Sequence, residues 1–211
     1  MKHITLIFFI IVNLSYSSTF EELNITDEDF VKVLHSHKKD LVFNRINDLI
    51  DLKTSLKDTN NIFTIVSSVN NFFNKYKYQT DEQLYKKNDY WATRKEFIFN
   101  GGGDCEDFVI AKYFTLLDIG ISENKLSVLH GIYKDQYHVV LAYQDNPYSD
   151  VYILDSLVKE IIPLSARDDL LVLYTLNTID MKNSSVVKTD LEFINNYKWT
   201  EVYLKSKNSV N

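Results

Sequence analysis

Apolar residues recur at helical spacing through the first half of the chain. The segment from Thr26 carries acids directly after a residue that can cap a helix, which is the pattern of a helix start. Further along, Ile, Leu, Val and Phe recur every three or four positions. The pattern predicts helices over Thr26–His37, Phe43–Leu56 and Asn60–Tyr76, then an irregular connection from Tyr76 to Trp91.

Another helix is predicted after three consecutive glycines. Asp104 is a suitable N-cap, and Phe108–Leu117 is almost wholly apolar. Gly120 is a suitable stop, because glycine readily takes the left-handed conformation that ends many helices. A helix that is apolar on most sides is buried, so we expect this one at the centre of the fold.

Beyond Gly120 the pattern changes to β-branched and aromatic runs separated by turn residues, such as Asn146–Asp150. Four strands are predicted, over Leu126–Tyr133, Tyr137–Tyr143, Val151–Leu154 and Leu170–Leu176. Helices followed by strands indicate an α+β fold, with N-terminal helices and a buried central helix packed on an antiparallel β-sheet.

The start of the chain has the pattern of a signal peptide. Lys2 precedes an apolar run from Ile4 to Leu14, and small residues at Ser15 and Ser17 suit a cleavage site. We predict a leader over residues 1–17 and one domain over residues 18–211. A retained N-terminal anchor is the alternative, and both place the domain outside the cytoplasm. The net charge of −6 argues against nucleic acid as a partner.

The chain has one cysteine, Cys105, so it has no disulfide framework. Cys105 lies at the predicted start of the buried helix, where the helix dipole favours a thiolate and lowers the thiol pKa. The glycines before it would let a substrate backbone come close. These features indicate a nucleophile, and the alternative is an inert core cysteine.

A thiol nucleophile needs a base, and the base needs a group that orients it. His138 begins one predicted strand and Asp155 follows the next. If the strands form a hairpin folded symmetrically about Asn146 and Pro147, residue 138 lies opposite residue 155 on the same face. A slip of one residue would separate the two side chains.

The other histidines have simpler interpretations. His130 lies on a predicted strand, where a core or edge histidine is expected. His35 and His37 belong to a polar helix end, and His3 belongs to the leader. We therefore expect His138 to be the base.

Three acids flank the cysteine: Asp104, Glu106 and Asp107. Left bare, they would oppose ionisation of the thiol. Acids in a first helical turn are commonly stabilising N-terminal charges. Oxygen ligands at this density also suit calcium, which would offset the negative charge, although the chain has no EF-hand loop.

Several blocks together resemble a known family. They are Trp91-Ala92-Thr93, Gly101-Gly102-Gly103-Asp104-Cys105-Glu106-Asp107, Ala111-Lys112-Tyr113-Phe114, His138–Tyr143 and Leu154–Leu157. In this order they resemble the bacterial transglutaminase-like cysteine proteinases, in particular the LapG-type periplasmic adhesin proteases. One residue departs from the pattern, since Arg94 stands where the family commonly has Pro after Trp-Ala-Thr. That puts the local loop shape in question.

The resemblance implies a papain/transglutaminase-like fold and a catalytic triad of Cys105, His138 and Asp155. It also implies calcium bound at Asp104, Glu106 and Asp107. The implied substrate is a large repeat-containing surface adhesin, cut near its N-terminal end at a pair of small residues to promote biofilm dispersal. The implied regulator is an inner-membrane receptor for cyclic diguanylate.

Two other functions remain open. One is acyl transfer to a lysine amine on the same fold, which shares all chemistry up to the acyl-enzyme. The other is a non-enzymatic, calcium-dependent envelope binding module. For the peptidase, the Cys105 backbone N–H is the expected oxyanion donor at the helix start, and the Trp91 indole is a candidate second donor.

Overall fold

The computed structural model describes residue 21, residues 23–176 and residues 190–207; the predicted leader at residues 1–17 lies outside them. The helices are α2 (Asp27–Leu34), α3 (Lys39–Leu56), α4 (Ile62–Phe73), α5 (Asp81–Tyr85), α6 (Arg94–Asn100), α7 (Cys105–Asp118) and α9 (Asp190–Lys207), with 3-10 turns at Glu123–Lys125 and Leu164–Ala166. Within these residues, no helix combines the length and apolar character that a bilayer span needs.

The main sheet has five antiparallel strands in the order β6-β5-β4-β3-β7. Its strands are β3 (Leu126–Tyr133), β4 (Gln136–Gln144), β5 (Val151–Leu154), β6 (Ile162–Pro163) and β7 (Leu170–Leu176). A separate parallel pair joins β1 (Lys77–Tyr78) to β2 (Gly102–Gly103). The predicted α+β architecture is confirmed.

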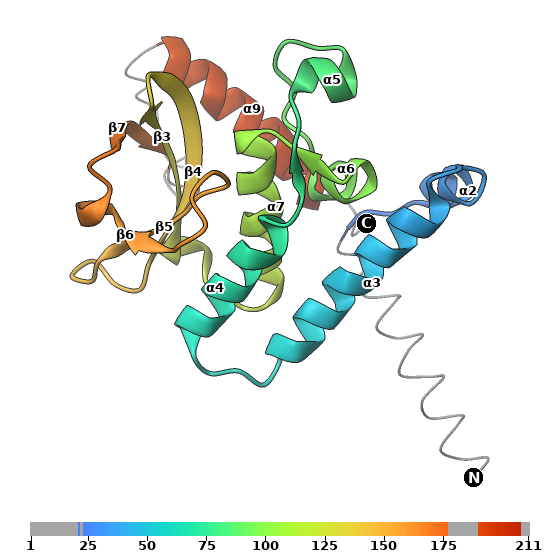
Figure 1. The fold of residues 1–211 in the computed structure, drawn as a ribbon, viewed down its shortest axis with the longest axis horizontal. Coiled ribbons are helices and arrows are strands. Elements are labelled where there is room, and N and C mark those ends of the chain that lie inside the picture. The colour runs from blue at the N-terminus through green and yellow to red at the C-terminus, as the bar shows by residue number, and fades with distance from the viewer. Residues whose placement is uncertain (1–20, 22, 177–189, 208–211) are drawn as a thin grey trace.

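The core is built around α7, which lies between the sheet on one side and α4 and α6 on the other (Figure 1). Ile110, Ala111, Tyr113 and Leu116 of this helix are fully buried, as its apolar sequence predicts. Trp199 of α9 packs edge-on against the Tyr113 ring, with 5.0 Å between ring centroids. The cysteine at the start of α7 is therefore carried by the most firmly packed helix of the domain.

The end of α7 also follows its sequence. Gly120 has a φ of 98°, its N–H donates to the Leu117 carbonyl at 2.9 Å, and the Ile121 N–H donates to the Leu116 carbonyl at 2.9 Å. This is the pair of hydrogen bonds of a Schellman motif, which requires a left-handed residue. The predicted stop at Gly120 is confirmed.

The pairing of β4 with β5 differs from the prediction. Gln144 pairs with Val151, and Leu141 pairs with Leu154. Continued by one residue, this register sets Asp155 opposite Val140, two residues from His138. The connection folds between Pro147 and Tyr148, where the Ser149 N–H donates to the Asn146 carbonyl. Because the slip is even, residues 138 and 155 still share a face.

Candidate active site

Three glycines lead into α7, and two of them let the chain pack closely on itself. Gly102 has a φ of 148°, and a Cβ atom there would lie 1.9 Å from the Lys77 carbonyl oxygen of β1. A Cβ atom on Gly103 would lie 2.3 Å from the Asp107 carboxylate. The space that we expected to admit a substrate backbone is occupied by the protein's own β1 and Asp107.

The Cys105 thiol is buried, with 7% of the residue exposed. It donates a hydrogen bond to Glu106 Oε2 at 3.1 Å, and the backbone N–H of Val139 on β4 faces the sulfur. Burial, followed by the charge of Glu106, raises the thiol pKa well above its ordinary value. The expectation that the helix start lowers this pKa is wrong, because desolvation and neighbouring acids outweigh the helix dipole.

His138 and Asp155 are in direct contact. His138 Nε2 donates to Asp155 Oδ1 at 2.7 Å, and both residues are buried, at 3% and 0% exposure. This is a diagonal contact, two residues out of register, which long side chains can span. Because Asp155 engages Nε2, the ring nitrogen left to accept a proton is Nδ1. His138 directly precedes Val139, whose N–H faces the Cys105 sulfur.

Asp155 has further partners that fix its orientation. Its Oδ1 accepts the Leu157 N–H at 2.8 Å, and its Oδ2 accepts from the Arg167 guanidinium at 3.0 Å. Burial raises the pKa of Asp155. The hydrogen bond and the charge of His138, together with the Leu157 and Arg167 donors, outweigh burial and lower the pKa below its ordinary value. Asp155 is therefore held as a carboxylate.

Sequence reasoning missed Arg167, which is 3% exposed and bridges Asp155 to Asp169. Its guanidinium donates to Asp169 Oδ1 at 2.7 Å and lies over the Tyr133 ring. In sequence, an arginine followed by two aspartates resembles a solvated surface segment, so no local signal marks it.

His130 has aromatic partners in place of a carboxylate partner. Its Nδ1 contacts the Tyr137 hydroxyl, and its ring stacks on Tyr174 at 4.6 Å and on Trp91 at 6.2 Å. Burial lowers the pKa of His130 to about 3. The ring is a neutral core histidine, as expected. Of the two expected oxyanion donors, Trp91 belongs to the aromatic stack around His130. The other, the Cys105 backbone N–H, faces the Tyr78 hydroxyl.

Carboxylates gather beside the thiol. Asp81, Asp104 and Asp107 each present an oxygen within 4.8 Å of the others, and Asp81, Asp89 and Glu106 form an overlapping group. Asp81 Oδ1, Asp104 Oδ1 and Asp107 Oδ2 are buried and have no hydrogen-bond partner. A cluster of carboxylates that includes buried, unpartnered oxygens fits a hard divalent cation, which prefers oxygen ligands.

The same acids disfavour one another's ionised forms, a repulsion that a cation would offset. Burial, followed by the charge of Glu106, raises the pKa of both Asp104 and Asp107. Burial also raises the pKa of Asp81, which is 3% exposed. Sequence reasoning grouped Asp104, Glu106 and Asp107 but missed Asp81. Asp81 lies on α5, in the stretch predicted to be irregular, and only the fold brings it to the start of α7.

Arg94, the residue that departs from the family pattern, leaves the loop shape intact. It is the first residue of α6, after a capping box formed by Thr93 and Glu96. Proline is favoured at this position because its missing N–H would have no helical partner. Arginine tolerates the same backbone, and its buried side chain forms an ion pair with Asp118 on α7.

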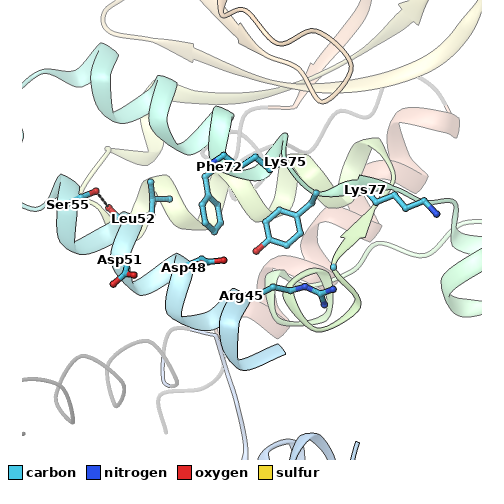
Figure 2. Close-up of a pocket in the computed structure, with 10 residues that line it drawn as sticks. Arg45, Asp48, Asp51, Leu52, Ser55, Phe72, Lys75 and Lys77 are labelled. Carbon is cyan, nitrogen blue, oxygen red and sulfur yellow. Dashed lines mark hydrogen bonds between the residues drawn. The ribbon is translucent and has the colours of Figure 1, made fainter. Parts of the chain in front are cut away.

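A groove of about 710 Å³ lies between α3, the end of α4 and β1, on the outer side of the glycine run (Figure 2). Basic Arg45, Lys75 and Lys77 and acidic Asp48 and Asp51 share its wall. Cys105, His138, Asp155 and the acid cluster do not line it. The groove is therefore distinct from the candidate active site.

Comparisons with known proteins identify the family of the chain. A family model described as bacterial transglutaminase-like cysteine proteinase matches residues 43–171. No curated protein matches the chain. Among solved structures, Legionella pneumophila LapG is 34% identical over 79% of this chain and 90% of its own, with a TM-score of 0.65.

Two further structures of that protein are similar to this chain. Calcium-bound Legionella pneumophila LapG covers 76% of this chain and 91% of its own, at 34% identity and a TM-score of 0.62. The EGTA-treated form covers 79% of this chain and 90% of its own, at 34% identity and a TM-score of 0.65. Because the family model matches more than half of the chain and the solved structure is 34% identical over most of it, the chain belongs to the bacterial transglutaminase-like cysteine proteinases.

Proposed function

We propose that the protein is a calcium-dependent cysteine endopeptidase of the LapG type, with Cys105 as nucleophile, His138 as base and Asp155 as the residue that orients the base. The observation that carries the proposal is the buried hydrogen bond from His138 to Asp155, next to the strand position that faces the Cys105 thiol. The family match supports the same reaction class.

In this mechanism His138 Nδ1 accepts the thiol proton, and the sulfur attacks the carbonyl carbon of the scissile peptide bond. The carbonyl oxygen becomes an oxyanion that takes the place of the Tyr78 hydroxyl as acceptor of the Cys105 backbone N–H. The tetrahedral intermediate then expels the amine, which takes the proton from His138. A water molecule, deprotonated by His138, hydrolyses the thioester and releases the acid and the free thiol.

We assign the cation to Asp81, Asp104 and Asp107, with Glu106 and Asp89 as neighbouring ligands. The support comes from the three buried oxygens without partners and from the calcium-bound form of the Legionella protein. A bound calcium ion supplies positive charge that offsets the carboxylates around the nucleophile. If Glu106 served as one of its ligands, its carboxylate would no longer accept the Cys105 thiol hydrogen bond, and the thiol proton would pass to His138.

The substrate and compartment form the outer part of the proposal. We propose that a large repeat-containing surface adhesin is cut near its N-terminal end, which releases it and promotes biofilm dispersal. An inner-membrane cyclic diguanylate receptor would sequester the protease. The likeness to LapG and the apolar N-terminal run support this assignment.

The test is incubation with recombinant N-terminal adhesin segments that contain a pair of small residues, followed by mass spectrometry. Hydrolysis gives two fragments whose summed mass exceeds the substrate by one water. Acyl transfer would instead give an isopeptide-linked product with loss of ammonia. Formation of that product without fragments would replace the peptidase by a transglutaminase.

His138→Ala and Asp155→Asn are each expected to lower turnover by about two to four powers of ten, because both disable the general base. The measurement is the initial rate of cleavage, alongside a thermal melt of each variant. His130→Ala is the comparison, since this buried histidine has no carboxylate contact. An equal loss of turnover in His130→Ala at unchanged stability would contradict the choice of base.

Arg167→Met is expected to lower the free energy of unfolding by about 3–5 kcal/mol at pH 7, because breaking a buried pair leaves a charge without its partner. The folded-state pKa of Asp155 is depressed, so the stability it contributes is full above about 3.8 and is lost as the pH falls through the lowered pKa. The difference between variant and wild type should therefore shrink in acid.

Urea unfolding at pH 7 and at successively lower pH measures this effect. Asp169→Asn is the matched control, because it removes the half-exposed side of the same bridge and should cost less than about 1 kcal/mol. A constant Arg167→Met penalty across the acid range would show that lost packing, rather than the Asp155 charge, explains it.

A further inference from the structure

The segment that carries Asp155 is held from α4, outside the sheet. β5 ends at Leu154, so Asp155 receives no ladder hydrogen bonds of its own. The Asn74 side-chain amide donates to the Asp155 carbonyl at 2.8 Å, and the Asn70 amide donates to the Lys159 carbonyl at 3.3 Å. Two asparagines one helical turn apart therefore hold both ends of the segment from residue 155 to residue 159.

The same asparagine pair is tied to the helix of the nucleophile. Lys112 lies two turns after Cys105 on α7, is fully buried, and donates to Asn70 Oδ1 at 2.7 Å. A lysine in a core is unfavourable unless it is hydrogen-bonded, and burial lowers its pKa to about 7, while the Asp155 charge acts in the opposite direction. A Leu or Met would fill this space without that cost.

We propose that Lys112, Asn70 and Asn74 are positioning residues that set the place of Asp155, and through it of His138, relative to Cys105. The inference rests on the proposed function and adds residues to its mechanism. The physical path is continuous: α7 carries Cys105 and Lys112, Lys112 bonds Asn70 on α4, and α4 holds the Asp155 segment. None of the three touches the reacting atoms.

Asn74→Ala is the first test, with the exposed Asn71→Ala on the same helix as matched control. The substrate is a quenched fluorogenic peptide with a bond between two small residues. We expect kcat to fall about tenfold to a hundredfold with KM unchanged, because a misplacement of about 1 Å costs this much. Equal kcat values for Asn74→Ala and Asn71→Ala, each fully folded, would overturn the inference.

A paired substitution separates positioning from packing. In Lys112→Met with Asn70→Leu, both polar partners become apolar groups of similar size, which typically restores stability. If the network positions Asp155, kcat stays low in the folded double variant. If it only fills the core, kcat returns to the wild-type value and the inference fails.

A spectroscopic measurement keeps the inference separate from the peptidase assignment. The His138 Nε2–H bonded to a buried carboxylate should give a downfield proton NMR signal. We expect this signal to shift or broaden in Asn74→Ala and to stay unchanged in Asn71→Ala. If the signal responds to the two variants as expected but the wild-type protein cleaves no substrate, the proposed function fails and the positioning role stands. If the signal is unchanged in Asn74→Ala, the positioning role fails and the proposed function stands.

Discussion

Cys105→Ala is expected to abolish cleavage while the fold stays intact. Removing the nucleophile of a protease triad typically lowers kcat by about six powers of ten. The residue is small, sits at the N-terminal end of a helix otherwise packed along its length, and forms no disulfide, so its removal leaves the core in place. Cleavage of an adhesin segment measures the loss, and circular dichroism and thermal melting verify the fold.

Ser127→Ala is the matched control for this prediction. It makes a similarly small change on β3, and it leaves the proposed mechanism untouched. In wild type, iodoacetamide should alkylate Cys105 in the calcium-loaded folded protein near neutral pH. An active Cys105→Ala protein would rule out the peptidase mechanism, and an inert thiol with no cleavage would favour the envelope binding module.

Chelation is expected to produce the second large effect, a loss of both activity and stability. A ligand that binds only the folded state at about 100 times its Kd adds about 2.7 kcal/mol, which for a domain of this size is roughly 5–10 °C in Tm. EGTA should therefore lower Tm and stop cleavage, and added calcium should restore both. Magnesium should restore less, since it requires a tighter octahedral shell and sheds water reluctantly.

Two variants connect that result to the acid cluster. Asp81→Asn combined with Asp104→Asn should reproduce the effect of EGTA with calcium present, because it removes charge from two of the three proposed ligands. Glu82→Gln, an exposed neighbour on α5, should behave as wild type. The prediction fails if chelated wild type melts at the same temperature and cuts at the same rate. The acids would then be helix-terminal charges.

Short-range signals accounted for much of the fold. The apolar run of α7 and its stop at Gly120 were predicted because these features act within a few residues. Asp104 occupies the predicted N-cap position, but its side chain makes no capping hydrogen bond. The strands of the main sheet were also predicted, except for the two-residue β6. The short helix α5 was missed, because five residues of mixed polarity carry almost no periodic pattern.

Register was harder to predict than strand identity. A symmetric hairpin would have set residues 138 and 155 opposite each other, whereas the hydrogen bonds around Asn146 and Ser149 shift the pairing by two residues. The His138–Asp155 contact survives because alternation along a strand has a period of two. The prediction of that contact was correct, although the pairing used to reach it was not.

What the sequence by itself determined is the local framework: a lone thiol at the start of an apolar helix, acids on either side of it, and a histidine and an aspartate at the ends of neighbouring strands. Tertiary structure alone decided which distant groups complete the site. Asp81 joins the acid cluster from α5, Arg167 holds Asp155, and Lys112 reaches Asn70 across the core. The physical reason is that each contact joins residues brought together by packing, and an isolated Asp, Arg or Lys leaves no periodic trace in its own neighbourhood.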